Sequence, residues 1–142
     1  MNASLTRILL GAAVLAALVP LAPAQNKAKG KIAKALAWDY LGEANVDGGA
    51  DHDRITVTRS EGTFRAIQLR VEKGPIEFNR VVVHYGNNQD ERIDLRERIA
   101  EGGQTRVIDL PGQQRVIQSV EIWYERARLG GAKPRVLLYG RR

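Results

Sequence analysis

The chain has 142 residues, of which 22 are Lys or Arg and 16 are Asp or Glu, so its formal net charge is +6. It contains no cysteine, which excludes disulfide bonds, a thiol nucleophile and a lipid attached through cysteine. The length suits one domain held together by its hydrophobic core alone, and the positive charge favours acidic partners.

The N-terminal segment, residues 1–24, predicts a cleaved secretory signal peptide. Arg7 precedes an apolar run from Ile8 to Leu21, and Ala22-Pro23-Ala24 is a small-residue cleavage pattern. The run is shorter than the roughly 20 residues of a membrane-spanning helix, so a retained anchor is the weaker alternative. We therefore expect a periplasmic or secreted protein that begins near Gln25, without a transmembrane anchor and without a nucleic-acid partner.

Residues 25–34 are polar and rich in lysine, without apolar periodicity. This composition predicts a flexible basic tether before a single domain at residues 35–142. Such a tether could lie against an anionic membrane or glycan, and a simple spacer is the alternative.

Strict alternation of apolar and polar residues dominates the rest of the chain and predicts half-buried strands. The apolar positions of these runs are Ile67, Leu69, Val71; Ile76, Phe78; Val81, Val83, Tyr85; Ile93, Leu95; Ile108, Leu110; Val116, Val120, Ile122, Tyr124; and Val136, Leu138. A short helical turn over Ile93–Ala100 is an alternative for one run.

Turn-forming residues separate these runs, as tight turns between strands require. They are Gly86-Asn87-Asn88, Gly102-Gly103, Pro111-Gly112 and Gly130-Gly131. About eight short strands at such spacing favour an all-β, antiparallel β-sandwich of jelly-roll type, with a small closed barrel as the alternative.

The polar sides of the strands supply candidate ligand-binding residues. Trp123 lies on the polar side of its run, where its ring could stack on a sugar; packing in the core or at a sheet edge is the alternative for Trp123 and for Trp38. The outward arginines Arg65, Arg70 and Arg126 could bind carboxylates or phosphates of an anionic polymer or glycan, and added salt should then weaken binding. These arginines could instead be solvated and paired with nearby acids.

The densest polar segment holds Asp47, Asp51 and Asp53 within seven positions, together with His52. Calcium prefers several oxygen ligands, so a calcium site is one hypothesis. The segment lacks the spacing of an EF-hand, and the same residue types form ordinary turns. Zinc is not expected, because the chain has only one other histidine.

Signals for catalysis are weak. The chain has two histidines, His52 and His84, and no GxSxG motif; Ser60 and Ser119, the serines beyond the signal segment, have no partner nearby in sequence. A hydrolase would need carboxylates from distant positions to meet in a cleft. We therefore expect a protein that is not an enzyme and carries no cofactor, apart from the calcium hypothesis.

Several motifs resemble a family of uncharacterised bacterial exported domains. The matching segments are Asp51-His52-Asp53, Phe64-Arg65-Ala66-Ile67, Arg106-Val107-Ile108-Asp109-Leu110-Pro111-Gly112, Arg115-Val116-Ile117 and Val136-Leu137-Leu138-Tyr139-Gly140. These segments are strand and turn signatures, so the resemblance implies no particular activity. It does imply an exported compartment.

Taken together, these features predict a non-catalytic exported β-sandwich that binds or supports a component of the cell envelope. An anionic envelope polymer is the expected ligand class, and a periplasmic protein is the alternative partner. A calcium-assisted carbohydrate-binding module is the second hypothesis, and an envelope hydrolase is the third.

Overall fold

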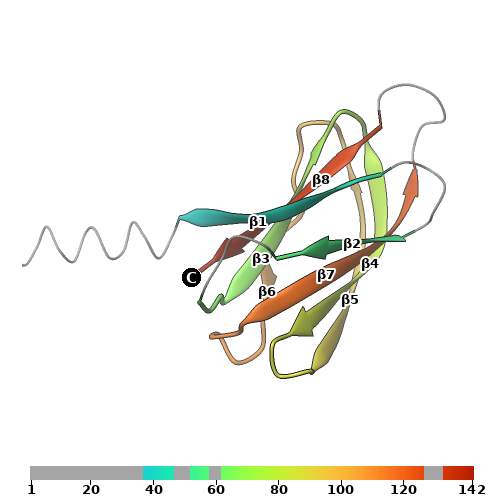
Figure 1. Ribbon diagram of the computed structural model, residues 1–142. Coiled ribbons are helices and arrows are strands. Elements are labelled where there is room, and N and C mark those ends of the chain that lie inside the picture. The colour runs from blue at the N-terminus through green and yellow to red at the C-terminus, as the bar shows by residue number, and fades with distance from the viewer. Residues whose placement is uncertain (1–36, 47–51, 58–61, 127–132) are drawn as a thin grey trace, which may run out of the picture.

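The computed structural model describes residues 37–46, 52–57, 62–126 and 133–142, and the regular structure in them is entirely β (Figure 1). The strands are β1 (Trp38–Asn45), β2 (His52–Thr56), β3 (Ala66–Glu72), β4 (Ile76–Tyr85), β5 (Asp90–Ile99), β6 (Ile108–Asp109), β7 (Ile117–Arg126) and β8 (Arg135–Arg141). The all-β prediction is confirmed. Within the same residues, no helix is long and apolar enough to cross a membrane.

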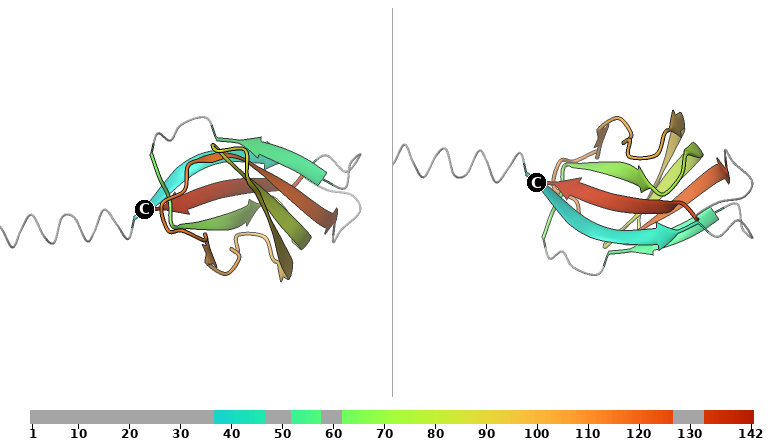
Figure 2. Two further views of the ribbon diagram at one scale, coloured as in Figure 1. Left: turned by 90° about the horizontal axis from the view of Figure 1, so that it is seen from below. Right: turned by 90° about the horizontal axis from the view of Figure 1, so that it is seen from above.

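The strands form two antiparallel sheets of four, in the orders β1-β8-β3-β6 and β2-β7-β4-β5, which face each other as two layers (Figure 2). Strand β1 pairs with β8, β2 with β7, β3 with β6 and β4 with β5, as in one long hairpin folded over itself. Additional pairing of β3 with β8 and of β4 with β7 rolls this hairpin into a jelly roll. The predicted sandwich of about eight strands is therefore confirmed.

The core lies between the two layers and is built from the inward-facing apolar residues of both sheets. Its largest fully buried side chains include Phe64, Phe78, Leu41, Ile55 and Ile67. The predicted inward positions of β3, β4 and β8 are buried as expected. Positive backbone φ angles occur at three of the predicted turns, at residues Asn88, Gly102 and Gly112.

One expectation about the alternation is wrong. Val116 was expected to face the core, but its side chain is 52% exposed. Strand β7 contains one extra residue, Gln118, opposite the step from His84 to Tyr85. The residues that precede Gln118 therefore have the opposite inward and outward parity from those that follow it, and Ile117 is buried in place of Val116. The segment for which a helical turn was the alternative belongs to strand β5.

A second irregularity shapes the outer face of β4. The register shifts between Phe78 and Arg80 against both neighbouring strands, β5 and β7. Asn79 is the extra residue relative to β7, so Asn79 and Arg80 both avoid the core while Phe78 and Val81 are fully buried. A bulge of this kind bends a strand and redirects its side chains.

The two sheets approach each other closely along their β1 and β2 edges. At Gly42 in β1, an added methyl group would lie 2.7 Å from the carbonyl oxygen of Thr56 and 3.0 Å from the side chain of Ile55. Only glycine therefore fits at this point without movement of the backbone.

Candidate functional site

The outer face of the β2-β7-β4-β5 sheet carries a row of four cross-strand neighbours: His52, Trp123, Arg80 and Asp94. The His52 ring stacks on the indole of Trp123, with centroids 5.3 Å apart and an interplanar angle of 12°. The guanidinium carbon of Arg80 lies 4.2 Å from the Trp123 ring centroid. Because β2 and β4 flank β7 on opposite sides, these two side chains cover opposite faces of the indole.

A hollow of about 500 Å³ opens beside this row, over the bulge of β4. Its lining residues are Glu77, Phe78, Asn79, Arg80, Arg92, Asp94, Arg96 and Trp123. Arg92 Nε lies 3.5 Å from Asp94 Oδ1, and both side chains are largely exposed. With three guanidinium groups against two carboxylates, the hollow has a positive balance.

Arg80 has an unsatisfied donor in this hollow. Its Nε atom is buried and has no hydrogen-bond partner, and among the described residues no carboxylate forms an ion pair with it. Stacking on Trp123 offsets part of the cost of burying the guanidinium, but an unpaired buried donor still costs free energy. No residue in the described ranges supplies the missing acceptor.

The next rows of the same face hold an ionic network around His84. Its Nδ1 lies 2.6 Å from Asp90 Oδ1, while its Nε2 lies 3.3 Å from Glu121 Oε1 without the alignment of a hydrogen bond. A hydrogen bond from Arg54 to Glu121 is the main reason why the pKa of that carboxyl is lowered from its usual range. Both imidazole nitrogens thus face carboxylates, although Ser119 is the cross-strand neighbour of His84.

The segment for which calcium was considered is only partly described. Asp47 and Asp51 lie outside the described residues. The carboxylate of Asp53 accepts a hydrogen bond of 2.5 Å from the hydroxyl of the buried Tyr124. His52 follows the opposite parity and stacks on Trp123, so adjacent residues of β2 serve opposite faces. In the part of the chain that the structure describes, no three His, Cys, Asp or Glu residues are grouped to hold a metal ion.

Removing the Tyr124 hydroxyl tests the structural role of Asp53. We expect Tyr124→Phe to lower the free energy of unfolding by about 1–3 kcal/mol, since hydrogen bonds to charged groups are stronger than neutral ones. Tyr40→Phe is the matched control, because the Tyr40 hydroxyl donates to Glu43 Oε2 at 2.8 Å in an exposed setting. Urea denaturation of both variants measures the difference, and equal losses would contradict a special role for the Asp53 contact.

The predicted ligand-binding residues are divided between the two sheets. Trp123 faces the hollow, whereas Arg70 lies on β3 in the other sheet, with its guanidinium carbon 4.0 Å from the Tyr139 ring centroid. Arg65 is exposed just before β3. Arg126 ends β7, and its side chain lies outside the described residues.

Both tryptophans are already in contact with cations. Trp38 is partly exposed at the start of β1, where the guanidinium carbon of Arg141 lies 5.2 Å from its ring centroid. On Trp123, a sugar could stack only after displacing Arg80 or His52. The arginine stacked on the indole of Trp123 is therefore a better candidate for ligand binding than the indole itself.

Sequence reasoning missed Arg80, although a signal for it exists. The inward residues Ile76 and Phe78 have even numbers, while the following ones, Val81 and Val83, have odd numbers. This change of parity requires an extra residue between them, and that residue turns Arg80 outward.

Comparison with known families covers nearly the whole sandwich. A family model described as "Domain of unknown function (DUF2541)" matches residues 12–140. The chain belongs to the DUF2541 family. The match confirms the resemblance to a family of uncharacterised domains, and it extends from before β1 to the penultimate residue of β8. No curated protein and no solved structure matches the chain.

Proposed function

We propose that this protein is a non-catalytic binding module of the bacterial cell envelope that recognises acidic groups of an envelope polymer. The signal-peptide pattern and the net charge of +6 support this setting. The observation that carries the proposal is Arg80, which is stacked on Trp123 with a buried Nε that has no hydrogen-bond partner. This arrangement suits an anion as the missing partner.

The stacked guanidinium is well suited to a carboxylate or a phosphate group. Contact with the indole of Trp123 restrains the plane of Arg80, and the in-plane N–H donors match the two oxygens of such a group. Arg92 and Arg96 line the same hollow from β5. A site whose donors are restrained before binding loses less conformational entropy when the ligand arrives.

The acids in the hollow narrow the class of ligand. Glu77 and Asp94 lie among the arginines, so a ligand with densely clustered negative charge would meet repulsion as well as attraction. A polymer that carries one acidic group per repeating unit places one anion at Arg80 and neutral atoms beside the acids. Carboxylated polysaccharides fit this description better than compact polyanions do.

The contacts of the two histidines favour a binding role for this protein over a catalytic one. His52 stacks on Trp123, and His84 lies between the carboxylates of Asp90 and Glu121. A general base for a serine nucleophile needs one imidazole nitrogen directed at that serine. The contacts of His84 engage both nitrogens with acids instead.

Substituting Arg80 tests the proposal. Isothermal titration with a short galacturonate oligomer, which has one carboxylate per sugar, measures the affinity of the protein and of Arg80→Gln. We expect the variant to bind about ten- to a hundredfold more weakly, since a charge-assisted hydrogen bond contributes about 1.5–3 kcal/mol. Binding by the unaltered protein should also weaken between low and physiological salt, because ions screen the attraction.

The matched control is Arg98→Gln, which removes the same charge from an exposed position of the same sheet, outside the hollow. We expect it to change the affinity by less than about threefold, as exposed surface charges contribute little. Equal losses in the two variants, or equal binding of an uncharged galactose oligomer, would show that Arg80 does not form a specific site.

A further inference from the structure

The opposite sheet repeats the arrangement found at Arg80. Arg70 lies on the outer face of the β1-β8-β3-β6 sheet, with its guanidinium carbon 4.0 Å from the Tyr139 ring centroid. Its Nε atom is buried and lacks a hydrogen-bond partner, as that of Arg80 does. Within the described ranges, no carboxylate pairs with Arg70. Each sheet therefore presents one arginine that is stacked on an aromatic ring and has an unsatisfied donor.

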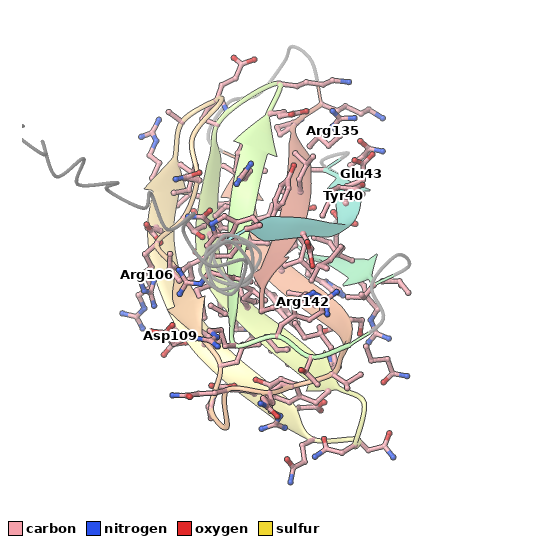
Figure 3. All side chains as sticks on the ribbon, turned by 90° about the vertical axis from the view of Figure 1, so that its left-hand side faces the viewer. Tyr40, Glu43, Arg106, Asp109, Arg135 and Arg142 are labelled. Carbon is pink, nitrogen blue, oxygen red and sulfur yellow. The ribbon has the colours of Figure 1, made fainter. Side chains whose placement is uncertain are left out.

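Arg135 on β8 of the same sheet has acidic partners, unlike Arg70. Arg135 pairs with Glu72, and its Nη1 lies 3.6 Å from Glu43 Oε1. Figure 3 shows Arg135, Glu43 and Tyr40 gathered at the upper right, with Arg106 and Asp109 along the left margin.

The surroundings of Arg70 are suited to a sugar acid. Tyr40 packs edge-on against Tyr139, with ring centroids 5.8 Å apart, and so extends the aromatic surface beside the guanidinium. Gln68 is buried and donates through Nε2 to the carbonyl oxygen of Thr105 at 2.9 Å, which holds the neighbouring segment in place. Aromatic rings next to an arginine offer a hydrophobic contact for a sugar ring and a donor for its acidic group.

We propose that Arg70 and Tyr139 form a second anion-binding site, so that one domain joins two acidic polymer chains. This inference rests on the proposed function, because it assumes the same class of ligand. Packed sheets lie about 10 Å apart, with the core between them, so the outer faces point in opposite directions. A short oligomer cannot reach both sites at once, whereas two separate chains can be held together by one protein molecule.

Stoichiometry and cross-linking test this inference. Titration with a galacturonate trimer should give two trimers per chain for the unaltered protein, and one for Arg70→Gln or Arg80→Gln. Light scattering with long polygalacturonate should rise on addition of the unaltered protein, because bridged chains form larger particles. Each single variant should lose most of this rise while still binding the trimer, and the double variant should lose both signals.

Lys73→Gln is the control, since it removes one exposed positive charge directly after strand β3 of the same sheet. It should retain two trimers per chain and the full scattering signal. Two trimers per chain in Arg70→Gln would overturn the second site and leave the Arg80 site standing. If the unaltered protein binds one trimer per chain, and this binding is lost in Arg70→Gln but kept in Arg80→Gln, the Arg80 site and the bridging are overturned. Absence of any trimer binding would overturn both proposals.

Discussion

Replacing Phe64 by alanine is expected to lower the free energy of unfolding by about 3–5 kcal/mol, the usual cost of removing a buried phenylalanine ring. The ring is 1% exposed and lies against Gly140, which has no side chain to fill the space left behind. The backbone of Phe64 exchanges two hydrogen bonds of 2.9 Å with Arg115, so this residue also links segments of the two layers. With no disulfide in the chain, little else can offset the lost packing.

Urea denaturation followed by circular dichroism measures this loss. Val116→Ala is the control, because Val116 is 52% exposed and should change the stability by less than about 0.5 kcal/mol. Since the total stability of a domain is about 5–15 kcal/mol, the Phe64 variant should be measured with a stabilising salt such as sulfate, which gives a complete folded baseline. Similar losses in the two variants would contradict the placement of Phe64 in the core.

Replacing Gly42 by valine is expected to lower the free energy of unfolding by about 3 kcal/mol, the upper end of the usual cost of overpacking. The first added carbon would lie 2.7 Å from the Thr56 carbonyl oxygen, and backbone atoms cannot rotate away as a side chain can. Relief of the clash requires β1 and β2 to separate, which exposes the core between the two layers.

Thermal unfolding of Gly42→Ala and Gly42→Val should show a graded loss, with valine worse than alanine. Gly102→Asn is the control, because Gly102 has open space around it and a positive φ of 80°, which asparagine tolerates. An unfolding temperature for Gly42→Val equal to that of the control would mean that the β1 and β2 edges do not meet as described.

Much of the fold could be predicted because alternation is a local signal. Each inward residue of β3 and β8 follows from the residues two positions away, without knowledge of the partner strand. The wrong expectation at Val116 has the opposite cause. An extra residue such as Gln118 is recognisable only when the paired strand is known, and the facing residues His84 and Tyr85 are far away in sequence.

The candidate site was less predictable for the same reason. Trp123 could be placed outward from its own run, and that prediction is confirmed. Its contacts with His52 and Arg80 depend on the registers of three strands, which no local pattern encodes. To predict that Trp123 and Arg70 lie in different sheets likewise requires knowledge of the order of strands in both sheets.

The pairing of β1 with β8 also determines when the protein can fold. Trp38 lies opposite Arg141, so the first strand of the sandwich is completed by the last one. The hairpin of β4 and β5 joins neighbours in sequence and can form early, whereas the β1-β8 ladder closes a loop of nearly the whole domain. Such long-range closure makes folding slow. A growing chain therefore stays incomplete until its final strand has been synthesised.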